Sequence, residues 1–418
     1  MQKYGLVFLL FFLSFETNGA AKDFELRGEY DDDFPLNEAI NDKLTELGPD
    51  GRFSLCGRSH FAAVFIDARN KNSDFDDAAV SMQGDLCMKY LGRTDSCGYG
   101  FEAGVKIRSG LIKRGEPVLK TVFLFIEADK VGIVKLGYIN TASDMFSLYG
   151  DKFSVGFYGA GSRNLGAFYE KSSGSIIDTG FSGDDVRAAK IVWISPVVGG
   201  FSVGLSFTPD GRDEGLFQTR RGSYSDFCGK TDFGDACGIF SKNVITGGGA
   251  FEFGDPDGFN VRISAAAWFG KGKSAFDDDA KVRNVRAFNI GAALCGESWK
   301  ISVGYTDGGK SLLPRNRLAG DAGKVYSAGL SGLFRKLEIS VGYFYSVVKF
   351  SRREKSKAEI ISAAAEYEFN KNLRVYFEYD NLRTDACGSA LEYASVCRLL
   401  GVGKNRANVF IIGSKITF

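Results

Sequence analysis

The chain has 418 residues, which is enough for two or three soluble domains or for one large closed sheet. Glycine numbers 53 and phenylalanine 37, whereas proline numbers 7, and the 44% hydrophobic and 25% charged fractions exclude both a disordered chain and a helical membrane protein. The net charge of +1 excludes the strongly positive field typical of nucleic-acid binding, and the single histidine excludes a metal site built from several histidines.

The first 21 residues have the pattern of an export signal. Lys3 precedes a largely apolar run from Leu6 to Phe15, and small residues follow at 19–21. This run is too short to span a bilayer as a helix, and no uninterrupted apolar stretch after residue 21 approaches the length of a transmembrane helix. We therefore predict a signal peptide over residues 1–21 and an exported chain that is either soluble or inserted in a membrane as a β-barrel.

Residues 22–50 form an N-terminal extension with the pattern of a short helix. Its apolar residues recur at helical spacing, and Gly48 follows the last of them as a stop signal. These apolar residues are Leu36, Ala39, Ile40, Leu44 and Leu47. We expect a short amphipathic helix that lies either in the periplasm or in the lumen of a barrel.

From residue 51 onward, apolar and polar residues alternate with a period of two. Between 101 and 111 the odd positions are mostly apolar and the even positions are polar or glycine, and the same alternation recurs in the segments that begin near 52, 80, 299, 361 and 373. Such a period gives each strand one apolar and one polar face. Short turns such as 370–372 alternate with long connections rich in glycine, aspartate and serine.

A soluble sandwich and a membrane barrel both show this alternation. Three features favour the barrel: the apolar faces often end in an aromatic residue, the polar faces carry charges of both signs, and short and long connections alternate. The last segment, 408–418, ends in mid-strand on Phe418, which suits the closing strand of a barrel. The sequence therefore predicts an all-β fold, a transmembrane antiparallel β-barrel.

Four segments carry a resemblance to a known family. They are 104–108 (GVKIR), 132–144 (GIVKLGYINTASD), 200–210 (GFSVGLSFTPD) and 413–418 (GSKITF). In this order and spacing they resemble the general diffusion porins of the Gram-negative outer membrane, of the alphaproteobacterial type, over residues 51–418.

The resemblance implies a porin β-barrel over residues 51–418 with an inward-folded third loop and about 16 strands, although about 18 also fit the chain length. It implies a homotrimer in the outer membrane, in contact with lipid and lipopolysaccharide, with no cofactor and no nucleic-acid partner. It further implies a water-filled channel for passive diffusion of small hydrophilic solutes and ions, without enzyme activity.

The charges of the predicted pore fall into two groups. Basic residues on the polar phase of the strands are expected to line the pore: Arg52, Arg58, Lys89, Lys106, Arg108 and Lys135. Acidic residues lie in the loop after the fifth strand, which by the resemblance folds inward: Asp144, Asp151, Glu170, Asp178, Asp184 and Asp185. Bases facing acids across a constriction would set a transverse field, in which polar solutes align while apolar solutes must displace ordered water.

An exported chain with eight cysteines is expected to form disulfides. Two pairs lie within single long loops, where we expect intraloop disulfides that brace the outer loops: Cys228–Cys237 and Cys387–Cys397. Cys87 and Cys97 flank a short turn, whereas Cys56 and Cys87 fall on neighbouring strands in the same phase, so two pairings of Cys87 remain open. Cys295 has no obvious partner, and the absence of a CxxC motif argues against zinc.

Two other functions remain as alternatives to a passive channel. An outer-membrane hydrolase would use His60 with a serine or aspartate partner, and an adhesin or receptor barrel would act through its disulfide-braced outer loops. The segment 304–311 matches the spacing of a phosphate-binding loop, but Pro314 rather than a helix follows it. The aspartate-rich runs at 74–77 and 277–279 are weak candidates for Ca²⁺ sites in outer loops, because they lack the EF-hand pattern.

Overall fold

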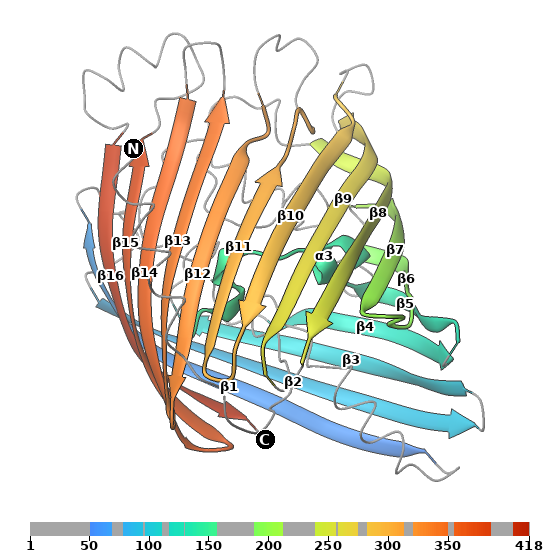
Figure 1. The fold of residues 1–418 in the computed structure, drawn as a ribbon, viewed down its shortest axis with the longest axis horizontal. Coiled ribbons are helices and arrows are strands. Elements are labelled where there is room, and N and C mark those ends of the chain that lie inside the picture. The colour runs from blue at the N-terminus through green and yellow to red at the C-terminus, as the bar shows by residue number, and fades with distance from the viewer. Residues whose placement is uncertain are drawn as a thin grey trace.

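The protein is a closed antiparallel β-barrel. The computed structural model describes residues 51–68, 78–94, 97–110, 117–128, 130–156, 188–211, 239–255, 258–274, 282–312, 321–349, 355–385 and 404–417. Within them, sixteen strands pair with their neighbours in chain order, and β1 pairs with β16 to close the sheet (Figure 1). The predicted fold class is confirmed, with 16 rather than 18 strands.

All but two of the sixteen strands have the nine or more residues that a tilted strand needs to cross a bilayer. In chain order they are β1 Arg52–Ala68, β2 Ala78–Thr94, β3 Cys97–Gly110, β4 Pro117–Ala128, β5 Gly132–Ile139, β6 Ala188–Ile194, β7 Phe201–Asp210, β8 Ile239–Gly254, β9 Asn260–Ser274, β10 Val285–Cys295, β11 Trp299–Asp307, β12 Lys324–Phe334, β13 Leu337–Lys349, β14 Lys355–Asn370, β15 Leu373–Asp385 and β16 Lys404–Thr417. The predicted signal peptide and the predicted helix in 22–50 lie outside the described residues.

The alternation in the sequence becomes an outward and an inward face. In β10, Ala287 and Asn289 face inward and are buried, whereas Phe288 and Ile290 face outward, and Ile290 is 51% exposed. In β1 the outward Leu55 is 74% exposed. Large apolar side chains exposed in this way around a barrel are typical of a surface that lies in lipid. Within the described residues, no helix has both the length and the apolar character needed to cross a membrane.

The two ends of the barrel differ in their connections. At one end, here called the short-turn end, strands are joined by tight turns such as 335–336 and 371–372. At the other, the long-loop end, they are joined by long segments such as 140–187 and 386–403. In outer-membrane barrels, short turns of this kind face the periplasm and long loops face the outside.

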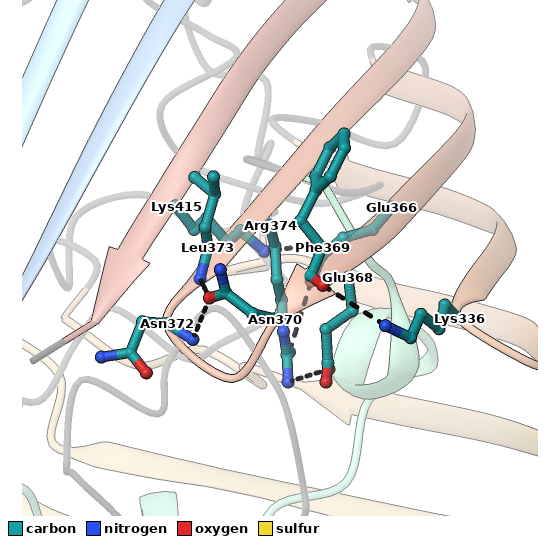
Figure 2. Close-up of polar contacts among 9 residues, drawn as sticks. All are labelled: Lys336, Glu366, Glu368, Phe369, Asn370, Asn372, Leu373, Arg374 and Lys415. Carbon is teal, nitrogen blue, oxygen red and sulfur yellow. Dashed lines mark hydrogen bonds and ion pairs between the residues drawn. The ribbon is translucent and has the colours of Figure 1, made fainter.

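The turn between β14 and β15 shows how a short connection is fixed. The side-chain oxygen of Asn370 accepts hydrogen bonds from the backbone N–H groups of Asn372 and Leu373, both at 2.9 Å (Figure 2). From the neighbouring hairpin, Lys336 Nζ donates to the carbonyl oxygen of Phe369 at 3.3 Å. An asparagine that satisfies the turn backbone in this way is the physical reason for the tight turn predicted at 370–372.

Aromatic side chains gather on the outward face at both ends. At the short-turn end, the ring centroids of Phe53 and Tyr90 are 4.8 Å apart. At the long-loop end, Tyr305 lies 5.8 Å from Phe288 and 5.0 Å from Tyr326. Two such bands match the aromatic girdles that flank the apolar zone of membrane barrels.

Candidate pore and its constriction

The third long connection of the barrel begins inside it. After β5, residues 140–156 contain a short helix, α3 (Ala142–Phe146), and a single 3-10 turn, η2 (Gly150–Phe153). Thr141 caps α3 by accepting a hydrogen bond from the backbone N–H of Asp144 at 3.3 Å. In Figure 1 this segment lies within the ring of strands, against β8–β12. The described part of the loop therefore follows the inner wall.

Inward-facing polar side chains hold this segment along its length. Its backbone N–H groups donate hydrogen bonds, 2.8–3.5 Å long, to side chains from six strands, namely Ser206, Thr246, Asn289, Ser327, Ser340 and Glu366. In the other direction, Ser302 Oγ donates to the carbonyl oxygen of Gly150 at 3.0 Å. A loop buried against a wall must have its backbone polar groups satisfied, and this row of hydroxyl, amide and carboxylate groups does so. The sequence reading missed this row.

A glycine on the wall lets η2 approach closely. Gly329 of β12 faces η2, and a Cβ added at Gly329 would overlap the carbonyl oxygen of Gly150. The position therefore requires a residue without a side chain. The close contact also explains how a loop can lie flat on the wall rather than across the lumen.

Two of the predicted pore bases form ion pairs with acids on the neighbouring strand. Arg58 of β1 lies 3.4 Å from the carboxylate of Asp85 on β2. Lys89 of β2 lies 3.1 Å from Glu102 on β3, and both side chains are nearly buried, at 10% and 3% exposure. Sequence reasoning named the bases but missed these two acids. The wall thus carries paired charges of both signs.

Of the other four predicted pore bases, the structure describes the side chain of only one, Lys135. Lys135 faces inward on β5, is buried, and has its ammonium 5.4 Å from the ring centre of Phe123, a cation–π contact. Lys106 and Arg108 lie on β3 in register with Asp85 and Gln83. Arg52 begins β1. The side chains of Arg52, Lys106 and Arg108 lie outside what the structure describes, so their pore-lining role stays a prediction.

A second charged group lies on the inner wall near the short-turn end, on β14–β16. Glu366 receives hydrogen bonds from Lys415 Nζ at 2.7 Å and from Arg374 at 3.4 Å, and Arg374 also pairs with Glu368 at 3.0 Å (Figure 2). The backbone N–H of Gly156 donates to the same carboxylate at 3.4 Å. Glu366 therefore ties the inward loop to a network of two bases and two acids.

The predicted acids of the constriction loop lie mostly outside the described residues. Asp144 is in the first turn of α3 and half-buried, and Asp151 is in η2, although its side chain lies outside what the structure describes. Outside the described residues lie Glu170, Asp178, Asp184 and Asp185. The transverse field between wall bases and loop acids thus stays a prediction.

Part of the inner wall is apolar. Near the long-loop end of β12–β16 and β1, inward-facing side chains form one buried cluster that includes Val64, Phe344, Ile360, Leu382 and Val409. Each of them is at most 1% exposed. The interior therefore combines a charged region, a hydroxyl-rich region under the loop and an apolar region.

The structure decides between the two predicted pairings of Cys87. Cys56 and Cys87 sit opposite each other on β1 and β2, with a Cα–Cα distance of 5.1 Å, and form a disulfide. The Cys87–Cys97 alternative is therefore wrong, because Cys87 is engaged across the sheet, and Cys97 is free, as is Cys295. Directly opposed positions bring two Cβ atoms within disulfide reach, which flanking a turn does not ensure. The predicted loop pairs lie outside the described residues: Cys228, Cys237, Cys387 and Cys397.

The hydrolase alternative rests on His60. His60 faces inward on β1 and is buried, in register with Gln83 and Lys415 rather than with a serine or an aspartate. Among the described residues, no group of three or more histidine, cysteine or acidic side chains is placed to hold a metal ion. The aspartate-rich runs at 74–77 and 277–279 lie outside the described part of the chain.

Comparison with solved structures shows the same kind of barrel. OmpF of Salmonella typhi, solved in complex with daunomycin, aligns over 88% of this chain and 97% of its own, with 15% identity and a TM-score of 0.59. An anion-selective porin from Comamonas acidovorans aligns over 88% and 100%, with 16% identity and a TM-score of 0.56. The trimer form of OmpT, an outer-membrane protein of Vibrio cholerae, aligns over 88% and 99%, with 16% identity and a TM-score of 0.54. At these identities the likeness supports the fold alone.

Sequence comparison gives the family. An uncharacterised protein of Rickettsia bellii is 24% identical over 280 residues, which cover 60% of this chain. The chain spans 62% of that relative's length, which is less than two thirds. The model of the Gram-negative porin family matches residues 23–386, most of the chain. The protein therefore belongs to the Gram-negative porin family.

Proposed function

We propose that this protein is an outer-membrane porin that forms a water-filled channel for passive diffusion of small hydrophilic solutes and ions. The observation that carries the proposal is the loop segment 140–156 fixed to the inner wall of a closed sixteen-stranded barrel. A segment held along the wall narrows a barrel without filling it. Membership of the porin family supports the same function.

The inner surface suits the passage of polar solutes. The ion pairs Arg58–Asp85 and Lys89–Glu102 line β1–β3, while Glu366 with Lys415 and Arg374 lines the adjoining part of the wall on β14–β16. A polar solute exchanges water for these charges and hydroxyl groups at little cost, whereas an apolar solute must displace ordered water without replacing its hydrogen bonds. The channel is thus expected to sort solutes by size and polarity.

The proposal includes location and assembly. Residues 1–21 act as the export signal, and the barrel inserts in the outer membrane with its apolar outer face in lipid. We propose a homotrimer; the description of one structural neighbour as a trimer form supports it. The channel works without a cofactor and without catalysis.

Liposome swelling tests the channel directly. Liposomes that contain the purified protein are diluted into isotonic solutions of sugars of increasing mass. Swelling rates should fall steeply with sugar size and rise in proportion to concentration. The absence of swelling with the smallest sugar would contradict a channel, and saturation with concentration would instead indicate a substrate-specific pore.

A His60→Ala variant separates the channel from the hydrolase alternative. Because His60 is buried in the wall at β1, we expect the sugar series to keep its size dependence in this variant. Lipid and peptide hydrolysis by the wild type should be no faster than in protein-free liposomes. Hydrolysis that disappears in the variant would instead support the enzyme.

A further inference from the structure

The seam of the barrel leaves the first part of β1 with one neighbouring strand among the described residues. β1 pairs with β2 from Arg52 onward, but it pairs with β16 only from Arg58 onward, where its partner is Thr417 (Figure 1). Within the part of the chain that the structure describes, residues 52–57 are therefore paired on the β2 side only. We call these six residues the open edge. They lie at the short-turn end, just past the end of β16.

The outward side chains of the open edge lie at the membrane surface of the barrel. Phe53 is 69% exposed, and its ring lies 4.8 Å from that of Tyr90 and 6.1 Å from that of Phe101, in the aromatic band of the short-turn end. Leu55, 74% exposed, lies one step further toward the middle of the barrel wall. Because aromatic bands mark the boundary of the hydrocarbon, the open edge reaches from the headgroup level into the apolar zone.

An open edge at this level leaves backbone groups unsatisfied. The N–H and C=O groups of a strand point alternately to its two sides, so every second residue of the open edge directs its groups away from β2. Water cannot satisfy such groups in the apolar zone, which is why membrane barrels leave no edge unpaired. The occupant of this edge must be an extended segment of about six residues with one apolar face.

The N-terminal extension contains a segment of this kind. Residues 23–30 (DFELRGEY) alternate strictly between two phases. One phase holds Phe24, Leu26 and Tyr30 together with Gly28, and the other holds three acids and one arginine. Period two over eight residues predicts a strand with one apolar and one polar face. The segment lies outside the described residues, so its pairing is an inference from this pattern and from the open edge.

The connection between this segment and β1 allows the two to pair. Residues 31–51 separate them, and these 21 residues are ample to return along an edge that rises about 20 Å. An antiparallel direction starts the segment beside the end of β16 and ends it beyond the barrel, where the connection has room. A tethered segment has a local concentration on the order of millimolar, which favours it over any separate chain.

The charges of the polar phase suit the same place. The turn between β14 and β15 lies beside the end of β16, because Asn372 Nδ2 donates to the carbonyl oxygen of Thr417 at 2.9 Å. Lys371 in this turn is exposed. Two acids, Asp23 and Glu25, stand in the first half of the segment. In the antiparallel direction this half lies next to the turn, so an acid meets the lysine.

We propose that residues 23–30 add to the open edge as an antiparallel strand in line with β16, and so close the seam at the short-turn end. The apolar phase continues the lipid-facing surface of Phe53 and Leu55, and the polar phase carries its acids toward Lys371. Backbone hydrogen bonds give this kind of strand addition its strength, and the alternating side chains give it its specificity. The inference goes beyond the proposed channel, since it requires only the barrel.

Amide hydrogen exchange of the full-length protein in detergent tests the pairing residue by residue. If the segment is in place, all six amides of 52–57 should exchange slowly, together with every second amide of 23–30. If only every second amide of 52–57 were slow, the edge would be open and the proposal wrong. Slow exchange throughout 52–57 with fast exchange throughout 23–30 would indicate another occupant and would also overturn it. This comparison uses the wild type alone and depends on no variant.

Two pairs of prolines identify the occupant. Leu26→Pro with Arg27→Pro must remove an N–H group directed at β1, because neighbouring residues of a strand point to opposite sides. Every second amide of 52–57 should then exchange at least about 10-fold faster. The matched control, Asp31→Pro with Asp32→Pro, places two prolines in the connection and should leave these amides within about two-fold of wild type. Equal effects of the two pairs, or no effect of the first, would contradict the proposed strand.

A carbodiimide, which joins a carboxylate to an amine as an amide with loss of water, tests which chain supplies the segment. Lys371 should be linked to Asp23 or Glu25 within a single chain, as found by mass spectrometry of the monomer band on denaturing electrophoresis. Lys371→Arg should abolish the link, whereas Lys336→Arg, in the neighbouring turn, should keep it. A link found only between two chains, or no link to Lys371, would overturn the proposal.

Discussion

The charged residues of the inner wall act in pairs set by the register between strands. Arg58 meets Asp85 and Lys89 meets Glu102 because β1, β2 and β3 place these positions opposite one another. Alternation in the sequence predicted that the bases face inward, since period two fixes the face of each residue. It did not predict the partners, because these depend on how neighbouring strands slide past one another. Lys89 and Glu102 are an exception, because only two residues, 95–96, separate their strands. Counting residues outward from this connection places Lys89 opposite Glu102.

Neutralising Arg58 alone should change ion selectivity. In Arg58→Gln the carboxylate of Asp85 loses its partner at 3.4 Å, so the wall gains a net negative charge. The cation-to-anion permeability ratio in planar bilayers at low salt should rise about two- to four-fold. The control is Arg58→Gln with Asp85→Asn, which removes both charges and should return the reversal potential close to that of wild type. An unchanged reversal potential in the single variant would exclude Arg58 from the conducting path.

The Lys89–Glu102 pair should matter for stability, because both side chains are nearly buried. Lys89→Met leaves Glu102 buried without its counter-charge, and the free energy of unfolding should fall by about 3–5 kcal/mol. Adding Glu102→Leu should recover most of the loss, because an apolar pair of similar size is often as stable as a buried ion pair. Urea unfolding followed by tryptophan fluorescence measures both. A double variant no more stable than the single one would contradict this account.

Among the elements, the strands were predictable and the inner surface only in part. Strands with one polar and one apolar face show the period of two clearly, as in β10, where large apolar outward residues alternate with mostly small or polar inward ones. Near the long-loop end of β14–β16 both faces are apolar: Ile360 and Ile361 are neighbours on opposite faces, as are Phe410 and Ile411. A strand that is apolar on both faces has no period to read.

The course of the inward loop could be expected from the family resemblance but not from its own residues. Its backbone is held by side chains such as Ser206, Asn289 and Ser340, which lie 64, 141 and 185 residues away in the sequence. Serine and threonine on an inward face look the same whether they meet water or a loop. Only closure of the barrel brings them to the same place.

A side chain at Gly329 should push the loop off the wall. In Gly329→Val the new side chain would overlap Gly150, so η2 must move toward the pore axis. Single-channel conductance should fall, and permeation of the larger sugars should fall more than that of the smallest. Gly332→Val is the matched control, because it lies on the same strand and the nearest atom to an added Cβ is 3.8 Å away. Equal conductance in the two variants would show that η2 does not shape the pore.

At the scale of the whole molecule, the barrel depends on the strand at its seam. β1 is held on one side by β2 and on the other by β16, which is the last strand of the chain. The sequence indicated β16 as the closing strand, and the register from Arg58↔Thr417 to Ala68↔Ala407 confirms it. The Cys56–Cys87 disulfide fastens β1 to β2 near the short-turn end. It therefore restrains the strand whose loss would open the sheet.

Removing this disulfide should weaken the closed barrel measurably. The bond spans a sequence separation of 31 residues, and closing a loop of that size stabilises the folded state by roughly 3–4 kcal/mol in the chain-entropy model. Cys56→Ser should therefore lower the temperature at which the compact form converts to the unfolded form on semi-native electrophoresis. Dithiothreitol should lower it equally in the wild type and have no effect on this transition in the variant.

Cys97→Ser is the control for that comparison, because Cys97 lies on the adjacent strand β3 but is free. Its transition temperature should match that of wild type without reductant and should fall with reductant as the wild type does. If Cys97→Ser instead destabilised the barrel and Cys56→Ser did not, Cys87 would have to pair with Cys97 in the folded protein. That result would restore the pairing across the turn, and it would leave β1 held at the seam by backbone hydrogen bonds and side-chain packing alone.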